Sequence, residues 1–138
     1  MSNKAITVLF WILRIVPAVI LLQTLFFKFT AAPESVTIFS QLGIEPWGRI
    51  GTGLAELVAA VLLLIPRTTV TGAVLTVLLM AGALGSHVTH LGFAGDMGSL
   101  AALAFISLAC SLAVAVRFRE ELICQVYAKV DRLRETNA

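Results

Sequence analysis

Residues 5–29 read AITVLFWILRIVPAVILLQTLFFKF, and only Arg14, Gln23 and Lys28 interrupt the apolar character of this stretch. At a rise of about 1.5 Å per residue, a helix of this length crosses a hydrocarbon core about 30 Å thick. A secretory signal peptide has a shorter apolar core that carries no arginine. Pro17 lies inside the run, where a bilayer helix tolerates proline through local adjustment or neighbouring partners. The stretch therefore predicts an uncleaved membrane-spanning helix.

The composition of the whole chain points to lipid as its solvent. Of 138 residues, 59% are hydrophobic and 13% charged, whereas soluble domains carry about 25% charged residues. The mean hydropathy is +0.96, which does not suit the large water-facing surface of a small domain. The net charge of +2 is too small to indicate nucleic-acid binding. Cys110 and Cys124 form no CxxC pair, so no dithiol redox centre or disulfide framework is predicted.

Three further segments are long and apolar enough to span. Residues 47–65 begin at Trp47, which suits the membrane interface, and carry Glu56 near their middle. Residues 68–91 contain no Asp, Glu, Lys or Arg, and residues 97–116 are likewise free of formal charge. We therefore expect an all-α integral membrane four-helix bundle, organised as a single membrane domain over residues 1–138.

The basic residues predict the orientation, because Lys and Arg in short loops are retained on the cytoplasmic side. One end of the expected bundle collects far more of them than the other, which places both termini in the cytoplasm. The richer end carries Lys4, Arg67, Arg117, Arg119, Lys129, Arg132 and Arg134, and the poorer end carries Lys28 and Arg49.

Two segments look amphipathic rather than spanning. Residues 33–42 have Pro33 suited to a first helical turn and are followed by Gly43, a residue typical of a C-terminal cap. We expect this short helix on the outer surface of the bundle. Residues 119–134 place Leu122, Val126, Val130 and Leu133 on one stripe between polar flanks. That pattern fits a helix at the cytoplasmic interface, and a helix for a partner protein or a solvated tail is the alternative.

Arg14 and Glu56 are charges that lipid alone would not accommodate, since each costs several kcal/mol at the bilayer centre. Counted from Ala5 and from Ile65, each lies nine residues, or about 13 Å, from the cytoplasmic boundary. We therefore predict an intramembrane ion pair between Arg14 and Glu56, linking the first two spans. Such a pair serves either architecture or function. Small residues four apart, such as Gly82 and Ser86, are expected to help the spans pack.

A second polar group falls toward the outer half and forms the candidate ligand site: Gln23, Lys28, His87 and His90. The two histidines stand three apart, so they share a helix face. A metal or haem is disfavoured, because zinc normally recruits three or four protein ligands and no cysteine or carboxylate stands at ligand spacing. Proton exchange, or hydrogen bonding to a carbonyl-bearing ligand, suits these side chains better. For His90 the competing interpretation is an interfacial residue at the edge of a loop.

Several short segments, taken in order, resemble the DoxX-like membrane protein family over most of the chain. They are Lys28-Phe29-Thr30, PESVTIFSQLG at 33–43, Pro46-Trp47, Gly51 through Glu56, Leu64 through Arg67, Gly82-Ala83 and Thr89-His90-Leu91. The resemblance implies a four-helix bundle in a bacterial or archaeal inner membrane. It also implies a small subunit of a quinone-linked oxidoreductase, or a protein that assists partner redox enzymes. Thiol chemistry is not supported, because the cysteine pair expected of redox-maturation relatives is missing.

Three functions therefore compete. In the first, the outer polar residues bind a quinone or lipid-like ligand, because a quinone head group needs hydrogen-bond donors and a proton route. In the second, the bundle is a non-catalytic structural or assembly subunit that holds a partner redox enzyme at the membrane. The third, a small proton-coupled transporter, lacks the discontinuous helices or inverted repeat that such proteins show. The residues do not distinguish a partner enzyme from a homo-oligomer.

Overall fold

The computed structural model describes residues 3–136, apart from the side chains at positions 3, 121, 122, 125, 135 and 136. Within this range the chain forms α-helices and one π-helical turn, with no β-strand. The predicted all-α fold is therefore confirmed. In chain order the elements are α1 (Asn3–Phe29), α2 (Pro33–Gln41), α3 (Trp47–Leu64), α4 (Thr69–Ser86), η1 (His87–Leu91), α5 (Asp96–Arg117) and α6 (Arg119–Thr136).

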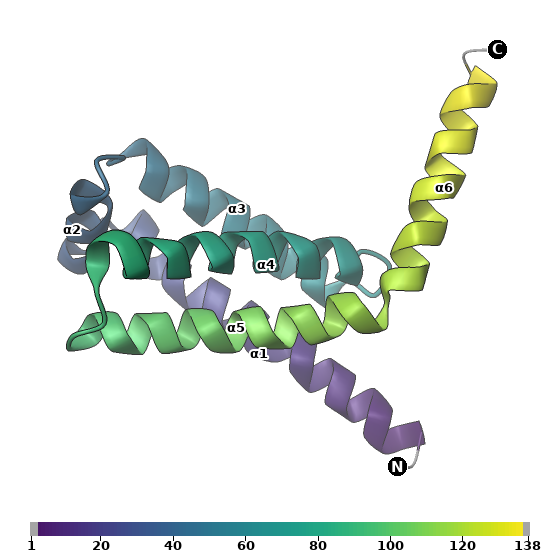
Figure 1. Cartoon of the computed structure of the whole chain (residues 1–138), viewed down its shortest axis with the longest axis horizontal. Helices are drawn as coiled ribbons and strands as arrows, with labels where there is room; N and C mark the ends of the chain where they lie inside the picture. Colours follow the sequence, from purple (N-terminus) through teal and green to yellow (C-terminus); the bar gives the residue numbers. More distant parts are fainter. Residues whose placement is uncertain (1–2, 137–138) are drawn as a thin grey trace.

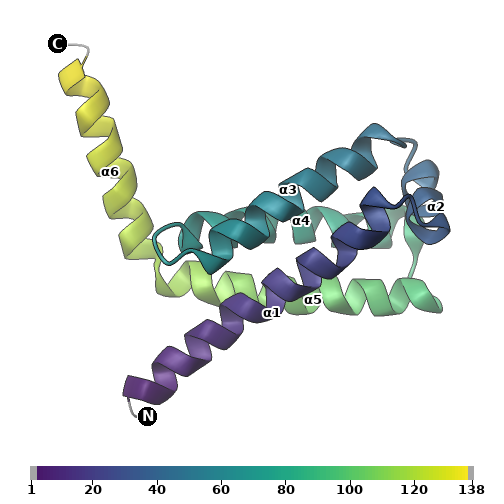
Figure 2. The same ribbon diagram turned by 180° about the vertical axis from the view of Figure 1, so that it is seen from behind.

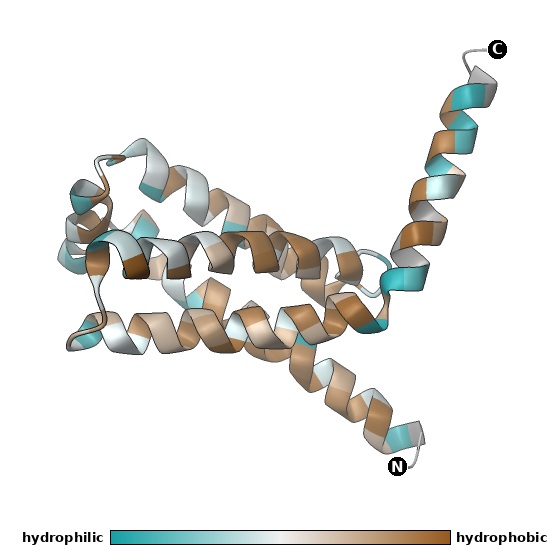
Figure 3. Ribbon diagram, viewed as in Figure 1, coloured by the Kyte–Doolittle hydropathy of each residue, from teal (hydrophilic) through white to brown (hydrophobic). Residues whose placement is uncertain are grey.

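Four of these segments are long and apolar enough to cross a membrane, namely α1, α3, α4 continued by η1, and α5. Around the bundle, α1 packs on α3, α3 on α4, α4 on α5, and α5 back on α1. The short helix α2 covers the end where α1 finishes and α3 begins, while α6 leaves the opposite end at a steep angle (Figure 1). The hydropathy colouring shows brown stretches along the four spans, teal at α2, and teal alternating with brown along α6 (Figure 3).

Helix α1 is longer than the spans that it packs against. Its 27 residues measure about 40 Å, which exceeds a hydrocarbon core of about 30 Å. The N-terminal part of α1 consequently runs past the ends of α3 and α4 and diverges from the bundle (Figure 2). Val8 and Ile12 on this part are exposed, as expected for side chains that face lipid.

The core is built largely from small side chains, which let the helix backbones approach closely. One close approach lies at Gly72 on α4, where an added Cβ would stand 2.5 Å from the backbone nitrogen of Leu63 on α3. By contrast, Gly82 has nothing within 4 Å of such a Cβ and does not pack against another span. The core cluster consists of Ala18, Leu21, Ala59, Ala60, Leu63, Ala73, Met80, Ala104 and Val114.

The turn between α4 and α5 is formed by a π-helical segment. In η1 the Gly92 N–H donates to the His87 carbonyl at 2.8 Å, which is a bond across five residues. Gly92 then adopts a φ of +72°, a conformation that favours glycine, and the chain reverses into α5. Wide helical turns of this kind are frequent at functional positions, and here the segment places His87 at the end of the bundle covered by α2.

Candidate functional site

The buried charges of the spans meet at the interface between α1 and α3. Lys28, near the C-terminal end of α1, places its ammonium nitrogen 2.5 Å from Oε2 of Glu56, in the middle of α3. The two side chains are 13% and 8% exposed, respectively. Two opposite charges so far removed from solvent stabilise each other, since either one alone would bear a large desolvation cost.

Thr24 completes this cluster. It lies one turn before Lys28 on α1, and its hydroxyl lies 2.9 Å from Oε2 of Glu56 and 2.8 Å from the Leu21 carbonyl oxygen. Both partners of the Glu56 carboxylate therefore contact the same oxygen. Among the described residues, no donor reaches Oε1 of Glu56, and the three-donor ammonium of Lys28 is engaged by a single acceptor. The cluster thus retains hydrogen-bonding capacity for a further molecule.

The spacing along α1 explains why these side chains face α3. Arg14, Leu21 and Lys28 stand seven residues apart, and a helix returns to nearly the same face after seven residues. Leu21 is fully buried. The stripe that α1 presents to the bundle therefore carries a cation at each end and a core leucine between them.

The predicted ion pair between Arg14 and Glu56 is wrong, because the structure gives both residues other partners. Arg14 Nε donates to the Leu63 carbonyl oxygen at 2.9 Å, and Nη2 donates to that of Leu64 at 3.0 Å. Its guanidinium also lies 4.3 Å from the centre of the Trp11 ring. These carbonyls end α3, where the helix dipole concentrates negative partial charge, so Arg14 caps the helix in place of a carboxylate.

The error came from measuring the depth of Arg14 from the start of its own helix. Because α1 projects beyond α3, Arg14 lies level with Leu63 and Leu64. Glu56 is eight residues, or about 12 Å, farther along α3 from Leu64. An arginine side chain does not cover that distance, whereas the flexible Lys28 side chain reaches Glu56 from the other end of α1.

Arg49 forms a second tie between α1 and α3. Its guanidinium pairs with Glu45, with Nη2 lying 2.8 Å from Oε1, and its Nη1 donates to the Lys28 carbonyl oxygen. It therefore caps the last turn of α1, much as Arg14 caps α3. Sequence analysis counted Arg49 only among the basic residues, and its buried position was not predicted.

In the described part of the chain, the structure does not bring the four residues of the predicted ligand site together. His87 is buried on η1, where its Nδ1 lies 3.0 Å from the Gly92 carbonyl oxygen and its ring stacks on Phe93 at 5.9 Å. His90 is exposed and contacts the hydroxyl of Thr89. Gln23 is exposed. Of the four, Lys28 alone belongs to the Glu56 cluster.

The chemistry of His87 follows from its contact with Gly92. A carbonyl oxygen only accepts a hydrogen bond, so Nδ1 is the donor in this contact and Nε2 takes no part in it. Within residues 3–136, no group of three or more His, Cys, Asp or Glu side chains is placed to hold a metal ion. His87 is thus a buried group at the end of the bundle where η1 contacts α2 and α5.

Sequence reasoning missed Thr24 and the bridging function of Arg49. Thr24 stands four residues before Lys28, a spacing that brings two side chains together on one helix face. That spacing, joined to the seven-residue repeat of Arg14, Leu21 and Lys28, would have predicted the stripe that faces Glu56. It would also have turned Gln23 toward the opposite side, because Gln23 follows Leu21 by about 200° of helical rotation.

Comparison with known proteins identifies a family for this bundle. A family model described as the DoxX-like family matches residues 12–116. That region runs from α1 to the end of α5 and contains both buried cations of α1 as well as Glu56. No curated protein and no solved structure matched the chain.

Proposed function

Because the chain belongs to the DoxX-like family, we propose that it is a small accessory subunit of a membrane redox system, with an intramembrane site for a quinone or lipid-like ligand. The Lys28–Glu56–Thr24 cluster is that site. The observation that carries the proposal is a largely buried ion pair between two apolar spans, in which one carboxylate oxygen has no protein partner among the described residues.

The cluster has the chemistry that a quinone head group requires. The Lys28 ammonium can donate a hydrogen bond to a quinone carbonyl, and Oε1 of Glu56 can accept one from a quinol hydroxyl. Both forms of the ligand would therefore find a partner at the same place. The ligand carbonyl is neutral, so binding would leave the charge balance of the ion pair unchanged.

The surroundings of the cluster favour an amphiphile over a water-soluble ligand. Exposed apolar side chains, including Phe26, Phe27 and Leu54, lie on α1 and α3 close in sequence to Lys28 and Glu56. A ligand that approaches from the hydrocarbon core would keep its tail among such side chains while its head group enters. Lipid-facing polar groups are rare, and those retained inside spans mark ligand or proton sites by default.

The test begins with the protein purified in a mild detergent. An organic extract is analysed for quinone by chromatography, and decylubiquinone is then titrated while the midpoint temperature of unfolding is followed. We expect bound quinone in the extract and a rise in the midpoint with added decylubiquinone. Glu56→Gln, which keeps the side-chain volume but removes the charge, should abolish that rise.

Gln23→Leu is the matched control, because Gln23 also lies on α1 but is exposed and, among the described residues, takes no part in the hydrogen bonds of the cluster. It should respond to decylubiquinone as the unmodified protein does. If Glu56→Gln proves too unstable, Lys28→Arg keeps both charges and tests the donor geometry alone. A quinone-free extract together with a flat titration of the unmodified protein would rule out this site.

A structural subunit is the second candidate, and one observation favours it. Lys28, Arg14 and Arg49 all tie α1 to α3, through Glu56, the Leu63 and Leu64 carbonyls and the Lys28 carbonyl, respectively. Such contacts would make the bundle rigid, as suits a subunit that binds a larger enzyme. Co-purification of a stoichiometric redox enzyme that is lost when exposed α1 residues are changed, with no quinone in the extract, would support this alternative.

A further inference from the structure

The last helix leaves the bundle in a direction that the four spans do not share. α6 begins two residues after α5 ends at Arg117 and runs across the bundle axis, at the end from which α1 also projects (Figures 1 and 2). If the spans cross a bilayer, a helix in this direction lies along the bilayer surface. Positive-inside bias predicts that this surface is the cytoplasmic one.

One face of α6 is apolar and exposed. Ile123, Val126 and Val130 are 41–53% exposed and lie within about 60° of one another at about 100° per residue. Leu122, which the sequence places on the same stripe, is outside the described side chains. α6 approaches α4 and α5 only near its beginning, so the bundle itself does not cover this apolar face.

Three of the four basic side chains described on α6 lie nearer to that face than its acidic side chains. Arg132 is the exception, at about 140° from the line midway between Val126 and Val130. Measured from the same line, Arg119 lies on it, Arg134 about 60° from it and Lys129 about 80° from it. The acidic residues with described side chains lie farther round, with Glu120 at about 100° and Asp131 at about 120°. Basic side chains beside an apolar stripe are the arrangement that lets ammonium and guanidinium groups reach lipid phosphates while the stripe enters the acyl region.

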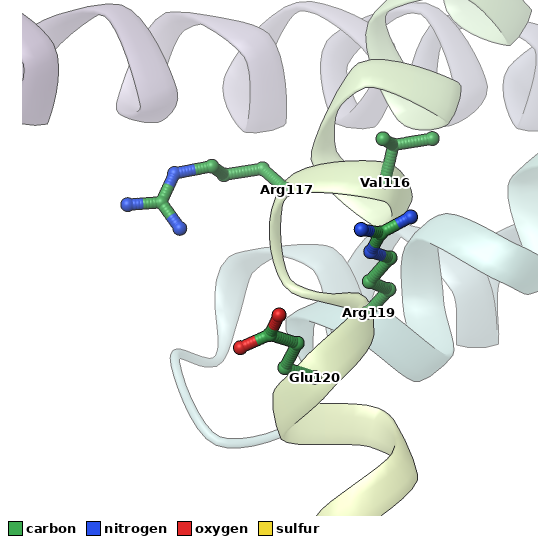
Figure 4. Close-up of a pocket in the computed structure, with 4 residues that line it drawn as sticks. All are labelled: Val116, Arg117, Arg119 and Glu120. Atoms are coloured by element: carbon green, nitrogen blue, oxygen red, sulfur yellow. The ribbon is translucent and has the colours of Figure 1, made fainter.

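A cavity of about 440 Å³ lies where α5 passes into α6. Its lining residues are Val116, Arg117, Arg119 and Glu120, and Figure 4 shows Arg119 rising toward Val116 while Arg117 and Glu120 extend to the other side. The Arg117 guanidinium is held 5.8 Å from the ring centres of both Phe10 and Phe118. Two cations against one carboxylate give the lining a net positive charge, at the level where phospholipid head groups would lie.

We propose that this junction and the apolar face of α6 together form a binding site for anionic phospholipid at the bilayer surface. Arg117 and Arg119 hold the head-group phosphate, and Val126 and Val130 enter the outer part of the acyl region. This site is separate from the Lys28–Glu56 cluster and does not depend on a quinone ligand.

The first experiment locates α6 in vesicles of phosphatidylcholine and phosphatidylglycerol. Full-length protein with Cys110→Ala and Cys124→Ser carries a spin label at Val126→Cys or Val130→Cys, with Ala128→Cys on the opposite face as the matched control. We expect the labels at 126 and 130 to be accessible to oxygen and protected from a water-soluble nickel complex, and the label at 128 to show the reverse. Nickel access at all three positions, as in a solvated arm, would overturn the proposal. So would protection of 126 and 130 from both reagents, as in a protein interface.

The second experiment measures lipid selectivity by native mass spectrometry of detergent-solubilised protein titrated with phosphatidylglycerol or phosphatidylcholine. We expect tighter binding of phosphatidylglycerol, weakened about fivefold by each arginine removed in Arg117→Gln and Arg119→Gln. Because Arg117 also packs on two aromatic rings, Arg119→Gln alone is the variant that leaves that packing intact. Arg67→Gln, at the same end of the bundle in the turn between α3 and α4, should leave the preference unchanged.

Three results would contradict the lipid site. The first is equal affinity for the two lipids, and the second is an equal loss in Arg67→Gln. The third is displacement of phosphatidylglycerol by inorganic phosphate at millimolar concentration, which would assign the cavity to a free anion rather than to a membrane head group.

Discussion

Arg14 and Lys28 are two cations buried on the same face of α1, yet the protein satisfies them in different ways. Lys28 meets a carboxylate, Glu56, in the middle of α3. Arg14 meets two backbone carbonyls at the end of α3. The end of the α1–α3 interface near Arg14 therefore depends on a neutral backbone partner that any helix sequence supplies. The end near Lys28 depends instead on one acidic side chain, Glu56.

This difference decides how each end should respond to mutation. Removing a carboxylate from a buried ion pair leaves a full charge without compensation, whereas removing a cation from a carbonyl leaves only a dipole that lacks a donor. The end of the interface near Lys28 should therefore be the more sensitive to mutation. It is also the end whose chemistry is adjustable, because a carboxylate can exchange partners or protons with a ligand and a helix terminus cannot.

The largest expected effect is that of Glu56→Gln, which removes the counter-charge of Lys28. We expect the free energy of unfolding in detergent to fall by about 3 to 5 kcal/mol, as for other broken buried pairs. A double-mutant cycle with Lys28→Met should show strong coupling, and the same cycle with Arg14→Met should show almost none. Unfolding titrations in mixed micelles supply the measurement, and coupling of Glu56 to Arg14 instead would reverse the assignment of partners.

Arg14→Met comes next. It removes two charge-assisted hydrogen bonds and leaves the Leu64 carbonyl without its donor, while the Leu63 carbonyl keeps the Thr69 hydroxyl at 3.4 Å. We expect a loss of about 2 to 3 kcal/mol in the free energy of unfolding, because no charge is stranded. The free energy of unfolding of Arg14→Lys should lie between those of the unmodified protein and Arg14→Met. Lysine keeps the favourable charge at the end of α3 but cannot donate to both carbonyls as the guanidinium does. A loss larger than that of Glu56→Gln would contradict the comparison.

Gly72→Ala tests the packing of α4 against the same end of α3 that Arg14 contacts. The added methyl group would stand 2.5 Å from the Leu63 nitrogen and 2.7 Å from the Leu62 carbonyl carbon, so α3 and α4 must separate. We expect a loss of about 1 to 3 kcal/mol from overpacking. Gly82→Ala, which meets open space on the same helix, should stay within about 0.5 kcal/mol of the original protein. Equal effects of the two substitutions in thermal unfolding would show that the close approach at Gly72 is not required.

The sequence predicted the helical architecture far better than the pairing of its charges. Runs such as 68–91 are so apolar that lipid is the only suitable solvent, and this property is local to each segment. Which charges meet depends instead on how far one helix slides past another. Equal counts from Ala5 and Ile65 placed Arg14 and Glu56 at one depth, but α1 overhangs α3, and this displacement is a property of the packed pair that no single segment encodes.

Some of that information was nevertheless present in the periodicity of α1. The seven-residue spacing of Arg14, Leu21 and Lys28 marks one buried face, and Gln23 falls outside it. The same reasoning could not reach the backbone carbonyls that bind Arg14, since a carbonyl has no signature in the sequence. Nor could it reach Arg49, whose partners are the Lys28 carbonyl on α1 and the Glu45 side chain in the connection between α2 and α3.

Gln23→Leu should change the free energy of unfolding least, and it tests whether the buried face of α1 excludes Gln23. Gln23 lies on α1 between the two buried cations in sequence, but it is exposed and faces away from α3. We expect the free energy of unfolding to change by no more than about 0.5 kcal/mol, with a slight gain in detergent or lipid because an uncompensated amide leaves an apolar surface. Thermal unfolding in parallel with Glu56→Gln measures the contrast. A loss comparable to that of Arg14→Met would mean that Gln23 has a buried partner, and the stripe of α1 that defines the site would then have to be drawn again.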